Sequence, residues 1–542
     1  MWINQLNYAN LSFLVVDDAP SMRGVLRDML RQNNAQVVEL RTNGDEAIEA
    51  LRLRAFDVVL CDDDLGDGRN GQQVLEEAKA RGWVGPACAW LMLCSEKSAE
   101  MIAGVMEYQP DGYLLKPFKV SDLQARLQKI MPKKIALVDI DQALRAKDYQ
   151  QALTLCDGRL AAAKTPNLEL LRIKCNIHIA MDEPSHAKLV YEQIIGRSKA
   201  PWAKVGLAKL LYREGDYAAA KAVLQTCMSD SPSFVEAYDW MAKVLLKEQR
   251  MEAAEEILAR AVKLSPNSPT RQAMLGEVAM KGGHTELAEK AFRKSVNVGK
   301  YSISRTADAY LGLARSASAN GRLGDALQAL TDVGREFDEP AVQLKAQVAK
   351  GIAYQENGQA DKALDVARTL ATLVEEGTLS TDAATTADLA DLLITSGGKT
   401  ERTLALQVVE GLVRDNHDNQ AMVGRLQAVM EARDLGDVGR SLIEKTRQEA
   451  IDLMSRGALL AREGRYSEAV DWMRQAKAAL PGNARVLFNA VAVMLAYLEK
   501  LGHDDAVLEE ARVTLASAVH LAPDDERAAS LAERLHHLMS SV

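Results

Sequence analysis

Four side chains that could do chemistry stand directly after short apolar runs near the start of the chain. They are Asp17 and Asp18 after FLVV, Asp62 after DVVLC, and Lys116 after GYLL. Carboxylates held close together repel one another, and a divalent cation that prefers hard oxygen ligands, commonly magnesium, relieves that repulsion. A phosphoryl group arriving there would be bridged by the metal and held by the lysine, with one carboxylate as nucleophile. These residues indicate an aspartyl-phosphate site.

Five β-rich apolar runs alternate with helical patterns and position these residues. The runs lie at 13–16, 37–40, 57–61, 89–93 and 112–115, and helical spacing covers Met22–Asn33, Gly44–Ala55, Gly71–Gly82, Ser98–Tyr108 and Ser121–Met131. This alternation predicts an α/β doubly wound domain with a five-stranded parallel sheet covered on both faces. Ligands of such domains gather beyond the carboxyl ends of the strands, where the reactive residues fall.

Three motifs carry a family resemblance over residues 11–131. FLVVDDAPSMR, DVVLCDDDLGDGRNG and GYLLKPF resemble the receiver domain of two-component response regulators, including the single-domain chemotaxis regulator. The resemblance implies a flavodoxin-like fold in which Asp62 is the phosphoacceptor and Lys116 contacts the phosphoryl oxygen. It also implies that the peptide bond between Lys116 and Pro117 is cis, which proline makes accessible.

The same resemblance implies a Mg²⁺ site. Asp18 and Asp62 would bind the ion directly, Asp17 mainly through water, and the backbone carbonyl of Asp64 would complete the protein ligands. Because an apolar strand delivers the first residue after its end into the cleft, Asp62 is favoured as nucleophile over its neighbours. We expect Asp63 and Asp64 to be solvated loop acids.

The predicted switch residues depart from the family in one place. Receivers carry a threonine or serine where Cys94 stands, and Ser95 occupies the next position. In the family this hydroxyl donates a hydrogen bond to a phosphoryl oxygen. A thiol is a weak donor, so either Ser95 makes this bond or phosphorylation is coupled more weakly to the loop. Tyr113 stands where receivers place an aromatic residue that switches rotamer, with core packing as the alternative.

The rest of the chain shows a helical repeat with a period of 34 residues. The sets related by this step are Ala208, Ala242 and Gly276; Ala220, Ala254 and Ala288; and Leu224, Leu258 and Phe292. Small residues in the first two sets and a larger apolar one in the third are the tetratricopeptide pattern, in which two antiparallel helices cross closely. Such units bury their apolar faces by stacking, which predicts an all-α solenoid.

The expected domains are a receiver at 1–131, a linker at 132–136 and a solenoid at 137–542. The clearest repeats span 201–300, with further units around 137–200, 304–372, 450–483 and 484–542, the last as one long helical pair. Residues 375–450 are helical by pattern but match the repeat poorly.

Composition restricts the partners and the compartment. The 542 residues carry a formal net charge of −9, which argues against nucleic-acid binding. The six cysteines have no metal-ligand spacing, and we expect reduced, buried thiols. The first residues lack a secretory signal pattern, and no apolar stretch reaches the roughly 20 residues of a membrane helix. A cytoplasmic protein without membrane insertion is expected.

These observations predict a signalling protein and not an enzyme. A sensor histidine kinase or phosphotransfer protein would phosphorylate Asp62 with Mg²⁺, and the solenoid would bind an unknown protein or peptide as output. No catalytic constellation is visible after residue 132. The alternative is a constitutive scaffold whose receiver only docks a kinase or stores phosphate. A homodimer is left open.

Overall fold

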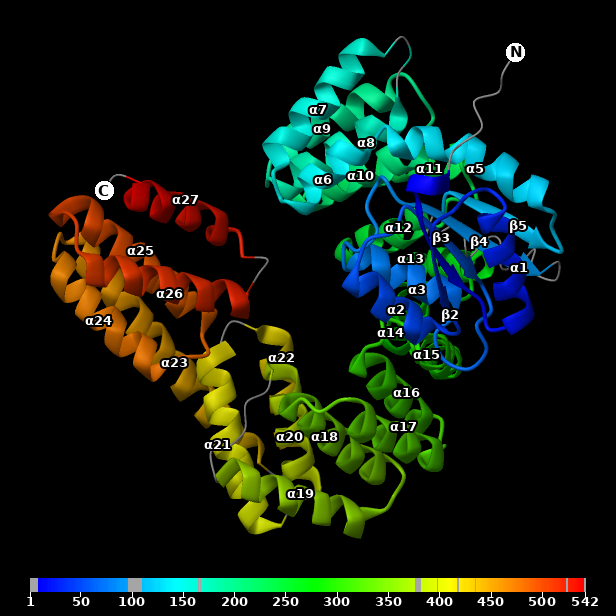
Figure 1. Cartoon of the computed structure of the whole chain (residues 1–542). Coiled ribbons are helices and arrows are strands. Elements are labelled where there is room, and N and C mark those ends of the chain that lie inside the picture. Colours follow the sequence, from blue (N-terminus) through cyan, green and yellow to red (C-terminus); the bar gives the residue numbers. More distant parts are fainter. Residues whose placement is uncertain are drawn as a thin grey trace. The chain divides into compact units, whose positions relative to one another are not determined.

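The computed structural model describes residues 8–95, 110–163, 165, 167–375, 382–396, 398–416, 419–433, 435–522 and 525–540. The chain forms two compact units, Met1–Ser316 and Ala317–Val542. In the described residues, the first unit holds the β-sheet and several helical pairs, and the second is helical (Figure 1).

A five-stranded parallel sheet in the order β2-β1-β3-β4-β5 organises the N-terminal part of the first unit. Its strands are β1 Ser12–Val16, β2 Val37–Arg41, β3 Val58–Asp62, β4 Ala89–Ser95 and β5 Gly112–Lys116. The described helices around it are η1 Tyr8–Asn10, α1 Pro20–Arg31, α2 Gly44–Leu53, α3 Gly71–Ala80 and α5 Val120–Ile135. This order confirms the predicted flavodoxin-like, doubly wound fold. The helix expected at Ser98–Tyr108 lies outside the described residues.

Both faces of the sheet are covered because successive strand residues point in opposite directions. Phe13 of β1 lies in one core cluster with Leu26 of α1 and residues of α5. Leu14, the next residue, lies in a second cluster with Ala47 of α2 and Val74 of α3. The sheet is therefore buried on both sides, and its polar chemistry is left to the strand ends.

The segment 132–136, expected as a linker, is mostly helical. α5 continues through Pro132 to Ile135, and Val138 begins the next helix. Met131 and Lys134 on this last turn are both buried, and Lys134 Nζ lies 2.7 Å from Asp111 Oδ1. Proline tolerates helical φ, so this packing and the ion pair hold the turn in a helical conformation.

Helical pairs follow directly in the first unit. They are α6 Val138–Arg145, α7 Tyr149–Ala162, α8 Leu168–Ala180, α9 Pro184–Ile195, α10 Pro201–Arg213, α11 Tyr217–Asp230, α12 Glu236–Lys247, α13 Met251–Leu264, α14 Pro269–Lys281 and α15 Thr285–Gly299. α16, Ala307–Ala319, spans the division between the units. The 34-residue step recurs in the turns inside three pairs, where Gly215, Gln249 and Gly283 all have positive φ.

The small residues of the repeat lie where two helices cross. Gly276 of α14 packs on the ring of Phe292 in α15, and a Cβ at this position would come within 2.8 Å of that ring. Ala220, Ala254 and Ala288 are fully buried on the second helices of their pairs. This confirms the predicted tetratricopeptide packing.

The second unit continues the helical series. Its further helices are α17 Leu323–Glu336, α18 Pro340–Glu356, α19 Ala360–Glu375, α20 Ala383–Ser396, α21 Lys399–Asn416, α22 Gln420–Glu431, α23 Gly436–Arg462, α24 Tyr466–Ala479, α25 Ala484–Leu501, α26 Asp505–Leu521 and α27 Arg527–Ser540. The expectation of one long pair over 484–542 was wrong, because three helices form there. Leu531 and Leu535 of α27 join the core of α25 and α26, which gives the third helix its apolar contact. Among the described helices, none has the length and apolar character needed to cross a membrane.

Candidate functional site

The carboxyl ends of three strands bring the predicted reactive residues together. Asp17 follows β1, while Asp62 and Lys116 are the last residues of β3 and β5. The Asp17 side chain is fully buried, Asp62 is 7% exposed, and Asp18 is exposed. A pair of buried carboxylates with a third at the rim therefore lines this edge of the sheet.

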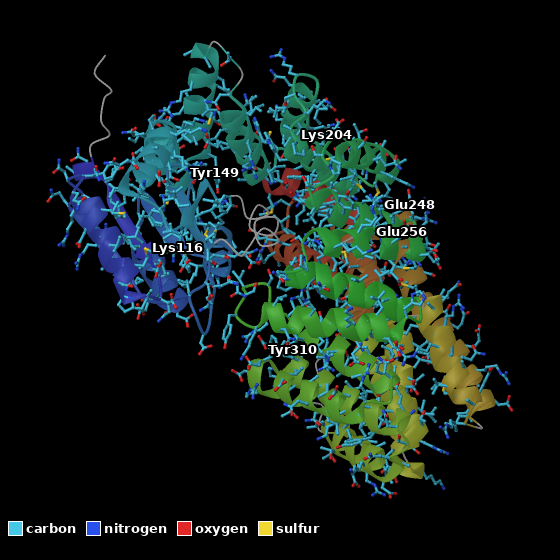
Figure 2. All side chains as sticks on the ribbon, turned by 90° about the vertical axis from the view of Figure 1, so that its right-hand side faces the viewer. Lys116, Tyr149, Lys204, Glu248, Glu256 and Tyr310 are labelled. Atoms are coloured by element: carbon cyan, nitrogen blue, oxygen red, sulfur yellow. The ribbon has the colours of Figure 1, made fainter. Side chains whose placement is uncertain are left out.

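Lys116 joins the two buried carboxylates. Its Nζ donates to Asp17 Oδ2 at 2.7 Å and to Asp62 Oδ2 at 2.5 Å, and the residue is labelled in Figure 2. The peptide bond between Lys116 and Pro117 is cis. One ammonium thus compensates two carboxylates, and the pocket keeps an excess of negative charge that suits a cation.

Burial and charge shift the pKa values of both partners. Burial raises the pKa of Asp62 to about 6, although the hydrogen bond and charge of Lys116 act in the opposite direction. Burial lowers the pKa of Lys116, but its hydrogen bonds to Asp17 and Asp62 outweigh this and leave it raised. With a pKa of about 6, the Asp62 carboxyl is mostly ionised around neutral pH.

The donor set fits a Mg²⁺ ion. Carboxylate oxygens of Asp17, Asp18 and Asp62 all lie within 4.8 Å of one another. Hard oxygen ligands in this number are what magnesium prefers. Arg23 holds the turn after β1, because its Nη1 donates to the carbonyl oxygens of Asp17 at 2.6 Å and Asp18 at 2.9 Å. Sequence reasoning missed Arg23, which sits six residues after Asp17 on α1.

The loop after β3 is closely packed against the site. Gly66 and Gly68 have positive φ, so this turn depends on glycine. Asp64 is exposed and its Oδ1 accepts a hydrogen bond from the Gly66 amide at 3.1 Å. Gly71, the first residue of α3, lies so close to the Asp62 carbonyl that a Cβ would be 2.0 Å from that oxygen. The start of α3 is therefore in contact with the backbone of the candidate phosphoacceptor.

Asp63 differs from expectation. We expected a solvated loop acid, but its side chain is only 3% exposed, and neither carboxylate oxygen has a hydrogen-bond partner in the described structure. The Asp63 amide donates to Leu93 O at 2.9 Å, which extends the pairing of β3 with β4 and keeps the residue inside. Burial, followed by the charges of Asp62 and Asp64, raises the pKa of Asp63 to about 6.

The predicted switch residues lie on β4 and β5. Cys94 is buried near the end of β4, and burial raises the pKa of its thiol to about 11. Ser95 ends the strand in an exposed position. Tyr113 is half-buried on β5, its hydroxyl has no hydrogen-bond partner in the part of the chain described, and burial raises its pKa. Their switching roles remain predictions, since residues 96–109 beside them lie outside the described structure.

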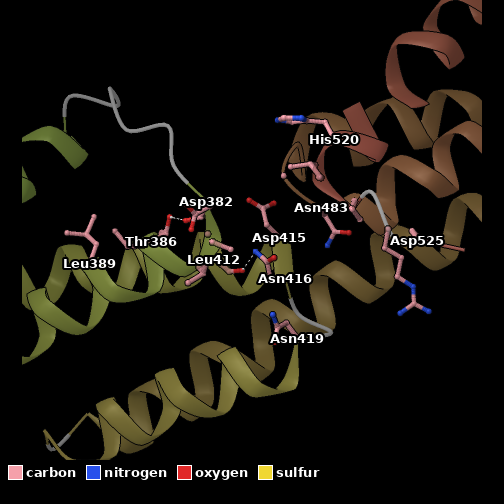
Figure 3. Close-up of a pocket in the computed structure, with 18 of the residues that line it drawn as sticks. Asp382, Thr386, Leu389, Leu412, Asp415, Asn416, Asn419, Asn483, His520 and Asp525 are labelled. Carbon is pink, nitrogen blue, oxygen red and sulfur yellow. Dashed lines mark hydrogen bonds between the residues drawn. The ribbon is translucent and has the colours of Figure 1, made fainter. Parts of the chain in front are cut away.

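The second unit contains a polar groove, which Figure 3 shows in close-up. Asp415 and Asn416 of α21 face a cavity of about 1050 Å³ together with Asn419 and Asn483 from later segments (Figure 3). Gln407 and Gly411 of α21 also line it. Carboxylates and amides here offer acceptors and donors of the kind that bind polypeptide backbone.

Comparison with protein-family models gives three matches, from two kinds of domain. The response regulator receiver domain model matches residues 13–128, and tetratricopeptide repeat models match residues 211–278 and 273–337. The chain is 33% identical over 126 residues to the transcriptional regulatory protein ZraR of Escherichia coli O157:H7, covering 23% of this chain and 27% of ZraR. It is 30% identical over 124 residues to the chemotaxis protein CheY-3 of Vibrio cholerae, covering 22% of this chain and 92% of CheY-3. The chain thus spans about a quarter of ZraR but nearly all of CheY-3.

Solved structures of two kinds resemble parts of the chain. One is PilF of Pseudomonas aeruginosa, with 16% identity and a TM-score of 0.33, covering 38% of this chain and 90% of that one. The other is the signal receiver domain of a modulated diguanylate cyclase from Desulfovibrio desulfuricans, with 23% identity and a TM-score of 0.21, covering 23% and 96%.

Proposed function

Because this chain belongs to the response-regulator family, with an N-terminal receiver domain followed by tetratricopeptide repeats, we propose that Asp62 accepts a phosphoryl group from a histidine kinase or phosphotransfer protein. The observation that carries this proposal is the bridge of Lys116 between the buried carboxylates of Asp17 and Asp62. This cluster lies at the carboxyl ends of parallel strands, where ligands of such sheets bind.

The transfer uses residues already in place. An oxygen of Asp62 forms the new bond to phosphorus while the bond between phosphorus and the donor imidazole breaks, and the imidazole leaves with that electron pair and takes up a proton. Lys116 exchanges its contact with Asp62 for one with a phosphoryl oxygen. A Mg²⁺ ion held by Asp17, Asp18 and Asp62, with the carbonyl of Asp64 as further ligand, supplies charge neutralisation when bound.

Labelling with a small phosphodonor tests the assignment. In the full chain with Mg²⁺ and acetyl phosphate, the Asp62→Asn variant should lose phosphorylation, measured as a mobility shift in a phosphate-affinity gel. Asp64→Asn is the matched control, since Asp64 is an exposed acid of the same loop whose proposed ligand is its backbone carbonyl, and it should keep labelling. Labelling that survives in Asp62→Asn would exclude Asp62 as the acceptor.

We propose protein binding as the output, because receiver and tetratricopeptide domains are not generally catalytic. The polar groove of the second unit is the candidate site. Gly411→Arg would fill it, since Gly411 is exposed and has open space beside its backbone, and Gly424→Arg on α22 is a matched control with equally open surroundings. Partner capture should respond to beryllofluoride, a phosphoryl analogue, and should be lost only in Gly411→Arg. Partner capture that is the same with and without beryllofluoride would favour the alternative of a constitutive scaffold.

The domain limits and compartment are parts of the same proposal. A receiver over residues 1–131 and a solenoid over 137–542 are part of this proposal, with the largely helical segment 132–136 as the junction between them. All six cysteines are unpaired and buried, which supports a reducing compartment such as the cytoplasm.

Measuring oligomeric mass with and without beryllofluoride decides whether phosphorylation produces a homodimer.

A further inference from the structure

Helix α3 of the receiver contacts the repeats within the unit Met1–Ser316. Gln73 Nε2 donates to the carbonyl oxygen of Val298 in α15 at 3.0 Å. The carboxylate of Glu76 accepts hydrogen bonds from Ser302 Oγ at 2.9 Å and Ser304 Oγ at 2.6 Å, in the connection between α15 and α16. These five residues form what we call the α3 contact. More than 220 residues of sequence separate its two sides, so the contact is tertiary and not local.

The chain after α3 also touches the repeats. The carbonyl oxygen of Trp83 accepts a hydrogen bond from Arg145 Nη2 at 3.2 Å. Gly85 lies against Asp141 of α6, where a Cβ would come within 1.6 Å of Asp141 Oδ1. Contacts near both ends of α3 therefore fix it to the helical region, and a movement of α3 cannot leave both unchanged.

The other side of α3 contacts the candidate phosphoryl site. The Gly71 amide donates to Asp63 O at 3.0 Å, and the Gly71 backbone packs on the Asp62 carbonyl. Only residues 63–70 separate Asp62 from the helix, and this is the loop proposed to supply the Asp64 carbonyl to the metal. A change in this loop is transmitted to the first turn of α3. Glu76, which contacts the repeats, lies on the same helix, five residues after Gly71.

From this arrangement we propose that phosphorylation of Asp62 weakens the α3 contact and thereby frees the α15–α16 connection. The inference rests on the proposed function and specifies how its signal leaves the receiver. Phosphorylation adds about −1.5 to −2 charge at the site beside the N-terminus of α3, where helix-dipole interactions are strongest. The loop and the first turn of α3 adjust to this charge.

The weakening requires only a small displacement of α3 away from the connection. All three hydrogen bonds of the α3 contact lie between 2.6 and 3.0 Å, and both serines bind the same carboxylate. Because hydrogen bonds weaken steeply beyond this range, a displacement of α3 by roughly 1 Å away from the connection lengthens these bonds. Ser302, which is buried in the contact, then becomes accessible.

Hydrogen exchange of the full chain tests the inference. Peptides covering 298–306 should exchange several-fold faster when beryllofluoride and Mg²⁺ are added. Glu76→Ala should raise exchange in the same peptides without beryllofluoride, because it removes both serine bonds. Glu49→Ala on α2 is the matched control, since Glu49 is exposed and pairs with Arg52, away from the contact, and it should change nothing in 298–306.

A second readout follows from linkage, because coupling between two sites is reciprocal. If phosphorylation weakens the α3 contact, removing the contact must favour the phosphorylated state, and Glu76→Ala should bind beryllofluoride about 3- to 10-fold more tightly than the unmodified chain. Glu76 is not part of the proposed phosphoryl site, so the Glu76→Ala variant should still be labelled at Asp62.

The outcomes separate this inference from the function on which it rests. Labelled Asp62 with unchanged exchange at 298–306 would overturn the inference and leave the phosphoacceptor intact. Unlabelled Asp62 would overturn both. If Glu76→Ala alone fails to raise exchange in the unphosphorylated chain, the α3 contact does not restrain the connection, and the inference is likewise overturned.

Discussion

Lys116 Nζ lies 2.5 Å from Asp62 Oδ2, although their strands β5 and β3 are separated in the sheet by β4. The lysine side chain therefore crosses the end of β4 to reach the carboxylate, and it continues to Asp17 beside β1. The Lys116 ammonium therefore links the carboxyl ends of three strands. Removing this side chain should lower the stability of the receiver as well as affect the proposed chemistry.

Lys116→Ala should destabilise the receiver when no divalent cation is present. It leaves Asp17 and Asp62 buried without their common cation, and breaking a buried ion pair in this way costs about 3 kcal/mol. Urea unfolding in EDTA should show this loss, and adding Mg²⁺ should restore more stability to the variant than to the unmodified chain. Lys129→Ala, an exposed lysine on α5, is the control. Equal effects of the two substitutions would contradict the structural role of Lys116.

Asp63 should make the stability of the metal-free receiver depend on pH. Its folded pKa is about 6 and its ordinary pKa is 3.8, so the folded state binds the proton more tightly. The stability that this protonation contributes is fully present below about pH 4 and is lost as pH rises through about 6, a change of about 3 kcal/mol. Asp63→Asn should remove that part of the decrease.

The measurement is the free energy of unfolding in EDTA at pH 4.5 and pH 8. Asp62 has a similarly raised pKa, so some decrease with pH should remain in Asp63→Asn. Asp64→Asn leaves Asp63 buried, and because burial is the largest cause of its raised pKa, most of the pH dependence should remain in this variant. A pH dependence that is the same in all three proteins would show that Asp63 is solvated.

The strands, the cluster of site residues and the close helix crossings could be predicted from local sequence patterns. Apolar runs located the strands, and because parallel strands end at one edge, they also placed Asp17, Asp62 and Lys116 together. The 34-residue step predicted a close helix crossing at small residues such as Gly276, because close approach of two helices restricts the residue size at a repeated position. The structure places the Phe292 ring there.

Features that depend on tertiary contact could not be predicted in this way. Three consecutive acids at 62–64 carry no local signal that Asp63 is buried, since this follows from its pairing with Leu93 on β4. The bond between Glu76 and Ser302 joins residues far apart in the sequence. A linker was expected at 132–136, but burial of the neighbouring Met131 and Lys134 keeps α5 helical through Pro132.

Gly276→Ala should destabilise the repeats although alanine favours helix. The added Cβ would lie within 2.8 Å of the Phe292 ring, and overpacking of this kind costs about 1 to 3 kcal/mol. Gly158→Ala is the matched control on α7, because it adds the same methyl group where nothing lies within 4 Å, and it should stabilise by about 0.5 to 1 kcal/mol. Thermal unfolding should therefore shift in opposite directions, and a shift of the same sign would argue against close crossing at Gly276.

Arg271→Lys should weaken the junction between neighbouring pairs while keeping the charge. Arg271 of α14 is 1% exposed, and its Nε and Nη2 each donate to Asp239 of α12 at 2.7 Å, while Nη1 donates to Ser265 O at 2.9 Å. A lysine cannot form this planar two-bond contact, and the loss of hydrogen bonds between charged groups costs about 1 to 3 kcal/mol. The expected result is faster hydrogen exchange in α12 and α14, with labelling at Asp62 unchanged. Arg293→Lys is the matched control, because the Arg293 side chain is 45% exposed and pairs with Glu289 of its own helix. If both substitutions left exchange in α12 and α14 as it was, the stacking of these pairs would have to rest on apolar contacts alone.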